Sequence, residues 1–201
     1  MSDWWSCGFV GEGTSDDALV DVLGRLTMSL RPGDDIDVSK HHWIERPFDR
    51  SVKGKVEALR TEPYDLIFIH RDSDAMRWES RAKEILGCCD ERVVPVIAVR
   101  MTEAWAIAHL WSNGEFRGWA KSKGVSLKTI ESQADPKRLL REYCSRNLRE
   151  LIPEAEFGYE RAHIIKSIID GCVSELKAWK KLCEQIKEAM VRVKPYIAWV
   201  N

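Results

Sequence analysis

The sequence lacks the features that mark several common classes of protein. Among its 201 residues there is no apolar run of membrane-spanning length and no signal-peptide pattern, so we expect a cytoplasmic protein without a membrane segment. Its six cysteines show no paired CxxC spacing, which favours buried thiols over zinc ligands or disulfides. The glycine patterns of the P-loop and of dinucleotide-binding folds are absent, as are internal repeats and low-complexity segments.

The balance of charge differs between the two parts of the chain. From residue 116 onward there are 17 Lys and Arg against 11 Asp and Glu, which leaves the first 115 residues with 14 of the 31 positive and 21 of the 32 negative residues. An acidic part beside a basic part suits an enzyme that acts on a polyanion, although the solvated faces of ordinary helices give the same pattern. At this length we expect one well-buried core with an appendage.

The first part of the chain alternates between apolar runs and amphipathic segments. This alternation is typical of an α/β fold, in which a parallel four-stranded sheet is flanked by helices. Strands are predicted at 4–10, 36–44, 66–70 and 93–99, and helices at 16–30, 52–61, 75–86 and 103–112. The strand that starts at residue 36 contains several polar residues and is expected to be the least regular.

Helical periodicity replaces the strand-like runs after Asn113-Gly114. Helices are predicted at 127–131, 136–147, 160–169 and 172–192. The last of these carries apolar residues three or four positions apart, which indicates a face that packs on the core or on a second copy in a homodimer. We therefore expect an α/β core at 1–114 and a helical extension packed on it at 115–201.

Acidic residues follow three of the predicted strands. Asp72 and Asp74 come after the third strand, Glu12 after the first and Glu103 after the fourth. Alternate residues of an extended chain point to the same side, so Asp72 and Asp74 are expected to aim at one point, where a cation would relieve their repulsion. Ligands of open parallel sheets bind at the carboxyl ends of the strands, so the acids are expected to converge on one site.

A glycine loop connects the first strand to its helix. Gly11 and Gly13 permit sharp turns of the backbone. Ser15 is expected to cap the helix, and the Asp16 carboxylate suits the positive end of the helix dipole.

Two other folds also gather acids at strand ends. A phosphoacceptor receiver domain could use Asp72, but it needs paired acids at the first strand and a lysine at a late strand end, which we cannot place. A haloacid-type phosphatase carries its DxD motif on the first strand rather than on the third. Neither order matches this sequence.

The motifs that remain are Glu12-Gly13-Thr14-Ser15-Asp16 after the first strand and Asp72-Ser73-Asp74 after the third. In this order they resemble the EGxxD and DxD motifs of the Toprim fold, the catalytic domain shared by topoisomerases, bacterial primases, a ribosomal RNA maturase and the overcoming-lysogenization-defect nucleases. Within that superfamily the chain is most similar to small stand-alone bacterial Toprim-like proteins associated with phage defence. In those proteins a segment like the one around Glu103 supplies a further acid.

The resemblance implies magnesium-dependent phosphoryl chemistry. The chain has neither a tyrosine-bearing strand-passage domain nor a primase zinc module, so a nuclease that cleaves phosphodiester bonds is expected. Hard oxygen ligands select Mg²⁺ or Mn²⁺. The implied metal ligands are Glu12, Asp16, Asp72, Asp74 and Glu103, and the residues expected to act in cleavage are Glu12, Asp72, Asp74 and Lys166.

Two of these roles stay open at this point. Glu12 could be a metal ligand or a general base. Lys166 could stabilise the charge on a scissile phosphate, or it could be a plain surface lysine.

The resemblance also implies partners. Nucleic acid, either DNA or RNA, would be the substrate, and a partner ATPase could accompany a role in bacterial antiphage defence. The alternative is a non-catalytic Toprim-like module that binds nucleic acid or a partner protein. Metal binding without cleavage would separate the two.

Overall fold

The structure of the protein, a computed structural model, describes residues 3–45, 47 and 49–197. Within these residues four strands pair in parallel in the order β2-β1-β3-β4, and helices flank the sheet. The strands are β1 (Trp4–Val10), β2 (Asp35–Lys40), β3 (Leu66–Asp72) and β4 (Val93–Ala98). The predicted α/β class with a parallel four-stranded sheet is confirmed. The strand predicted at 36–44 is shorter than expected, because the chain leaves the sheet after the amide of His41 has donated to the Phe9 carbonyl.

The sequences of the strands explain their places in the sheet. The first five residues of β3 and all six residues of β4 are buried, as expected for strands that are covered on both faces. Pro95 in β4 cannot donate a backbone hydrogen bond. It is tolerated because β4 pairs only with β3 and therefore lies at an edge of the sheet.

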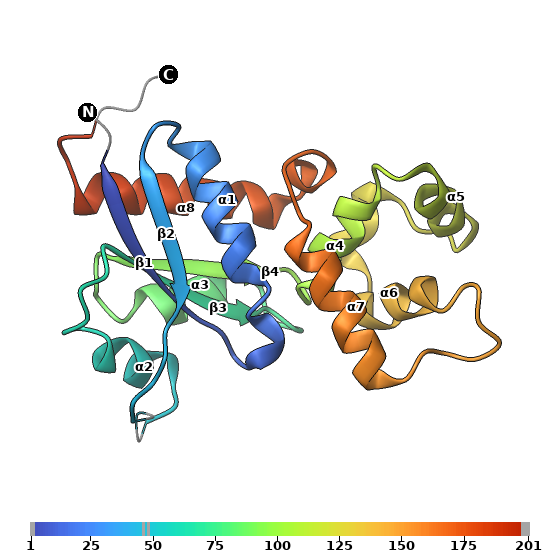
Figure 1. The fold of residues 1–201 in the computed structure, drawn as a ribbon, viewed down its shortest axis with the longest axis horizontal. Helices are drawn as coiled ribbons and strands as arrows, with labels where there is room; N and C mark the ends of the chain where they lie inside the picture. The colour runs from blue at the N-terminus through green and yellow to red at the C-terminus, as the bar shows by residue number, and fades with distance from the viewer. Residues whose placement is uncertain (1–2, 46, 48, 198–201) are drawn as a thin grey trace.

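Helices cover both faces of the sheet, as Figure 1 shows. The flanking helices are α1 (Leu19–Leu30), α2 (Val52–Ala58), α3 (Trp78–Leu86) and α8 (Lys177–Val193). Phe68 of β3 packs in the larger apolar cluster with α1 and α8, whereas its neighbour Ile69 packs in the smaller cluster with α2 and α3. Successive strand residues thus face opposite layers, as strand geometry requires.

The strand order creates a crevice between β1 and β3. From β1 the chain passes through α1, on one face, to β2, whereas from β3 it passes through α3, on the other face, to β4. The two connections therefore leave adjacent strand ends in opposite directions. Such a switch point is where ligands bind in open parallel sheets.

The remaining helices gather beside the sheet, at the right of Figure 1. They are α4 (Glu103–Leu110), α5 (Gly114–Ser122), α6 (Pro136–Cys144) and α7 (Glu154–Lys166), and the short 3₁₀ turns are η1 (Thr14–Asp16), η2 (Leu127–Ser132) and η3 (Cys172–Glu175). α5 was not predicted from the sequence, and α7 begins six residues earlier than predicted. Asn113 begins α5 by accepting hydrogen bonds from the amides of Glu115 and Phe116.

The long helix predicted at 172–192 is wrong in one respect, because it is broken at Leu176. Leu176 is extended, with ψ at 139°, and it separates η3 from α8. The Glu131 carboxylate of η2 accepts hydrogen bonds from the amides of Lys177 and Ala178 and so caps the start of α8. A tertiary contact from 46 residues away thus sets the helix start.

The helical extension is not set apart from the sheet. The larger apolar cluster runs from the β1 and β3 side chains through α4 to α7, and α8 returns to lie against β4. The predicted boundary at residue 114 stays a prediction.

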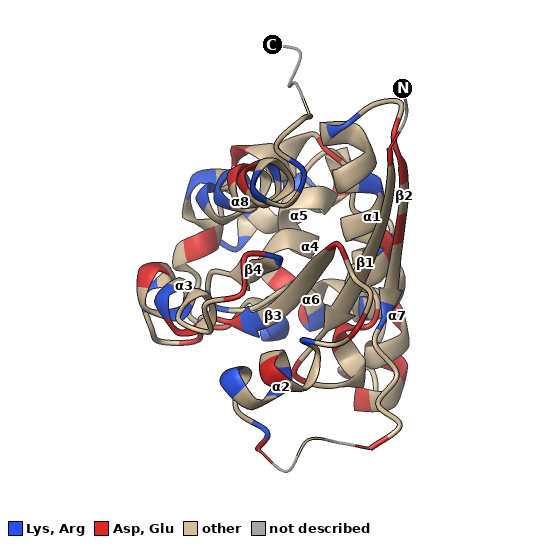
Figure 2. Cartoon of the chain, turned by 90° about the vertical axis from the view of Figure 1, so that its left-hand side faces the viewer, with Lys and Arg blue, Asp and Glu red and all other residues tan. Residues whose placement is uncertain are grey.

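Charge on the outer surface of α8 is mainly positive, as Figure 2 shows. This pattern agrees with the positive excess of the second part of the chain. No helix in the described ranges is both long and apolar enough to cross a lipid bilayer.

Candidate functional site

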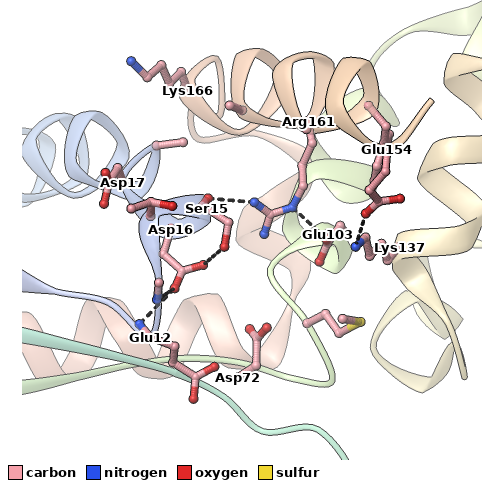
Figure 3. Close-up of a pocket in the computed structure, with 17 residues that line it drawn as sticks. Glu12, Ser15, Asp16, Asp17, Asp72, Glu103, Lys137, Glu154, Arg161 and Lys166 are labelled. Atoms are coloured by element: carbon pink, nitrogen blue, oxygen red, sulfur yellow. Dashed lines mark hydrogen bonds and ion pairs between the residues drawn. The ribbon is translucent and has the colours of Figure 1, made fainter. Parts of the chain in front are cut away.

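A cleft of about 470 Å³ lies at the switch point, and we call it the acidic cleft (Figure 3). The loop after β1, the end of β3, the start of α4 and one side of α7 line it. Its charged side chains are Glu12, Asp16, Asp17, Asp72, Glu103, Glu154, Lys137, Arg161 and Lys166. Six carboxylates against three cations give the cleft an excess of negative charge.

Asp16 fixes the loop after β1. Its Oδ2 atom accepts hydrogen bonds from the backbone N–H groups of Glu12 at 2.9 Å and Gly13 at 3.1 Å. The Ser15 hydroxyl donates to its Oδ1 atom at 3.2 Å. Asp16 therefore sets the position of Glu12, and of its two carboxylate oxygens Oδ1 is the freer to face a cation.

Gly11 is needed in this loop for space rather than for a special backbone angle. A Cβ atom on Gly11 would lie 2.9 Å from the Cβ of Asp16, whereas one on Gly13 would find no atom closer than 4.0 Å. Neither glycine has a positive φ. The predicted cap is wrong, because Ser15 lies inside a 3₁₀ turn and α1 begins only at Leu19.

Asp72 is the last residue of β3 and lies on the same side of that strand as Phe68 and His70. The Thr102 hydroxyl donates to its Oδ1 atom at 3.2 Å. Burial raises the pKa of Asp72 to about 7, and the negative charges of Glu103 and Asp16 contribute to this rise. This carboxyl group therefore lacks the positive partner that would keep it ionised.

His70 lies beneath the cleft and is fully buried. Its Nδ1 atom is 2.9 Å from the Val96 carbonyl oxygen, which can only accept, so Nδ1 carries the proton. Its Nε2 atom faces Thr102 Oγ1 at 3.3 Å and Asp72 Oδ1 at 3.6 Å. Burial lowers the pKa of His70 and keeps the ring neutral, so it does not neutralise the acids above it.

Glu103 begins α4 and is only 2% exposed. Its Oε1 atom accepts a hydrogen bond from Arg161 Nε at 2.6 Å, and its buried Oε2 atom has no hydrogen-bond partner in the part of the chain that the structure describes. Arg161 belongs to α7 and also donates to the Ser15 carbonyl at 2.7 Å (Figure 3). Arg161 thus connects the helical extension to the start of α4 and to the loop after β1. This role was not predicted from the sequence, because the partners of Arg161 are 58 and 146 residues away.

Asp74 does not join the other predicted ligands, so the expectation that it aims at the same point as Asp72 is wrong. β3 ends at Asp72, and Asp74 takes a left-handed conformation with φ at 50°. Its amide donates to the Arg100 carbonyl at 3.0 Å, which fixes the turn. Its side chain is 62% exposed and pairs with Arg81 at 3.6 Å, outside the acidic cleft.

Glu12 and Lys166 lie at the rim of the cleft. The Glu12 carboxylate forms an ion pair with the Arg71 guanidinium, which turns it toward the side of the loop away from Glu103. Lys166, at the end of α7, lines the cleft, and its ammonium is 3.5 Å from Asp21. At 57% exposure it is free to move toward a ligand in the cleft.

The donor set of the cleft fits a hard divalent cation. Carboxylate oxygens are the ligands that Mg²⁺ and Mn²⁺ prefer. Within the described residues the Glu103 Oε2 atom has no hydrogen-bond partner, and no Lys or Arg forms an ion pair with the Asp72 carboxylate. In the described part of the chain, however, no group of three or more His, Cys, Asp or Glu side chains is arranged to hold a metal. Binding therefore requires side chains to reorient, above all that of Glu12.

Comparison of the chain with protein-family models, with curated proteins and with solved structures finds no match. A function for the chain therefore has to be argued from the cleft itself.

Proposed function

We propose that the protein is a metal-dependent nuclease of Toprim type that cleaves phosphodiester bonds with Mg²⁺ or Mn²⁺. The observation that carries this proposal is the convergence of Glu12, Asp72 and Glu103 from three separate strand ends on one cleft. The buried Glu103 carboxylate pairs with Arg161 through its Oε1 atom only, and its Oε2 atom has no hydrogen-bond partner among the described residues, whereas buried polar groups are normally hydrogen-bonded. The divalent cation that accompanies a polyanionic substrate would supply positive charge to these carboxylates.

The residues of the cleft would have different roles in this proposal. Asp72 and Glu103 would hold the cation, with Asp16 Oδ1 and a reoriented Glu12 as further donors. A bound Mg²⁺ or Mn²⁺ lowers the pKa of a bound water and polarises the phosphate. Thr102 and Arg161 orient the two main ligands through hydrogen bonds to Asp72 and Glu103.

Lys166 has the position expected of a phosphate-binding residue in this proposal. It lies on the wall opposite Asp72 and is separated from the metal ligands, so its ammonium can contact a non-bridging oxygen of the scissile phosphate. Glu12 fits either as a ligand or as the base that accepts a proton from water, once Arg71 releases it. A part in antiphage defence, with a partner ATPase, extends this proposal and rests on the resemblance of the motifs.

One observation favours a second candidate, a non-catalytic module that binds nucleic acid or a protein. Two acids of the cleft already have cationic partners from the chain, because Glu12 pairs with Arg71 and Glu103 with Arg161. In such a module these ion pairs would be permanent features of the fold, and the cleft would bind its partner without cutting it.

The test is cleavage of single-stranded DNA, double-stranded DNA and structured RNA in Mg²⁺, Mn²⁺ or EDTA. Asp72→Asn removes the central carboxylate, and Asp74→Asn, outside the acidic cleft, is the matched control. We expect wild type and Asp74→Asn to cleave only with metal and Asp72→Asn to be inactive. Cleavage by Asp72→Asn would refute the site, and inactivity of all three proteins with Mn²⁺ binding intact in calorimetry would establish the non-catalytic module.

A further inference from the structure

A second cleft adjoins the acidic cleft, and we call it the basic cleft. It also measures about 470 Å³, and it shares Glu12, Gly13, Thr14 and Asp17 with the acidic cleft, so the two clefts flank the same loop. Its other walls come from the end of β2, from α2 and from the end of β3. Its cationic and aromatic side chains are Lys40, Arg50, Lys55, Arg71, His41 and Trp43.

The two clefts have opposite charge. Four lysine and arginine side chains face two carboxylates in the basic cleft, whereas three face six in the acidic cleft. These basic residues come from separate elements, so the pattern is a property of the fold rather than of one helix face. Neighbouring regions of opposite sign suit a ligand that brings its own phosphates next to a bound cation.

Lys55 is the cation that α2 contributes to the basic cleft. It is half-buried, and its ammonium makes one hydrogen bond, to the Gly11 carbonyl at 3.3 Å, and no ion pair with any described carboxylate. Burial lowers the pKa of Lys55, and the positive charge of Arg71 lowers it further. An anion in the cleft would offset both effects.

Lys40 and Arg71 already engage acids of the shared loop. Lys40 pairs with Asp17 at 2.7 Å, and Arg71 pairs with Glu12. Both acids are 38% to 39% exposed, so a phosphate group can compete for the two cations. Arg71 presents a planar guanidinium, which binds a phosphate by two parallel hydrogen bonds.

We propose that the basic cleft binds the sugar-phosphate backbone of a single nucleic-acid strand beside the cleavage site, with Lys55, Lys40 and Arg71 as the phosphate contacts. This inference rests on the proposed function of the acidic cleft. The half-buried Trp43 ring, edge-on to His41 at 4.4 Å, offers a face on which an unpaired base stacks. A cleft of this volume takes a nucleotide-sized segment, which favours a single strand over a duplex.

The test measures binding of a fluorescent single-stranded oligonucleotide in EDTA, in the Asp72→Asn background so that no cleavage occurs. Lys55→Gln removes the uncompensated charge, and Lys53→Gln, an exposed lysine of the same helix outside the cleft, is the matched control. We expect Lys55→Gln to weaken binding about fivefold and to reduce the slope of log K against log salt by about 0.7, the value for one lost phosphate contact on a single strand. Lys53→Gln should change neither quantity.

Lys55→Arg separates phosphate binding from the bond that Lys55 makes to the loop. Lys55→Arg keeps the positive charge, so the slope of log K against log salt should equal that of the Asp72→Asn parent. Thermal unfolding of each variant checks that it is folded. Equal affinities and slopes for Lys55→Gln and Lys53→Gln would overturn the inference, as would a duplex that binds more tightly than the single strand.

The outcome also separates this inference from the proposed function. Metal-dependent cleavage by the wild type, together with binding that is insensitive to Lys55, would leave the nuclease standing and refute the basic cleft. Lys55-dependent binding by a protein that never cleaves would support the basic cleft and refute the proposed nuclease.

Discussion

Replacing Asp72 with asparagine tests whether the acidic cleft holds uncompensated negative charge. Burial, together with the charges of Glu103 and Asp16, raises the pKa of Asp72 from 3.8 to about 7. A pKa that is higher in the folded than in the unfolded state means that the folded state binds this proton more tightly, so stability is lost as pH rises from about 4 to about 7. At ~1.36 kcal/mol per pKa unit, the full loss is about 4 kcal/mol.

Asparagine keeps the shape of the side chain and an oxygen for the Thr102 hydroxyl, but it carries no charge. In EDTA we expect Asp72→Asn to be more stable than the wild type by about 4 kcal/mol at pH 8 and by about 1.5 kcal/mol at pH 5, where the folded wild type is protonated. Urea unfolding followed by tryptophan fluorescence at the two pH values measures these differences.

Asp74→Asn is the control for this experiment. Its side chain is 62% exposed and lies outside the acidic cleft, so its effect should stay within about 0.5 kcal/mol at both pH values. If Asp72→Asn stabilises the protein at pH 8 by no more than the control does, the claim that the cleft holds uncompensated negative charge is refuted. Millimolar Mn²⁺ should stabilise the wild type and narrow the gap between the two proteins, because the cation then supplies that charge.

Three further predictions concern the surroundings of the site. Arg161→Met should destabilise the protein by about 3–5 kcal/mol in urea unfolding, because it leaves the Glu103 carboxylate buried without its partner. Adding Glu103→Gln to Arg161→Met should restore most of the lost stability. Losses that simply add in the double variant would contradict this. Gly11→Ala should cost about 1–3 kcal/mol and weaken Mn²⁺ binding in calorimetry, because its Cβ would press on the loop, whereas Gly13→Ala should leave Mn²⁺ binding unchanged. Lys166→Gln should slow cleavage about tenfold with little change in stability, and an unchanged rate would make this a plain surface lysine.

The fold could be predicted from the sequence because its sheet depends on local patterns. Residues 66–69 and 93–98 are continuous apolar runs, and such runs are buried on both faces wherever helices flank a parallel sheet. The break at Leu176 could not be predicted, because the Glu131 carboxylate that caps the following helix belongs to a distant segment. The overlooked α5 spans only nine residues and includes Gly114 and Gly118, and glycine has a low helix propensity.

The candidate site was predictable in part for the same reason. Acids that directly follow parallel strands come together at one edge of the sheet, and this places Glu12, Asp72 and Glu103 in one cleft. Asp74 departs from the pattern because alternation holds only while the strand continues, and a bond to the Arg100 carbonyl turns the chain immediately after Asp72. Arg161 gave no local signal, since any arginine on a helix resembles a solvated one until its partners are known.

The Arg71–Glu12 ion pair connects the two clefts and predicts that their ligands bind cooperatively. Glu12 cannot coordinate a cation while it is paired with Arg71, and Arg71 cannot bind a phosphate with its full charge while it is paired with Glu12. A strand bound in the basic cleft would release Glu12 to the metal, and by reciprocity the metal would strengthen binding of the strand by the same factor. The wild type should therefore bind Mn²⁺ more tightly in calorimetry when a non-cleavable single strand is present, and unchanged affinity would show that the two clefts act independently. Under this proposal the chain would assemble its complete set of metal ligands only when a nucleic-acid strand is bound.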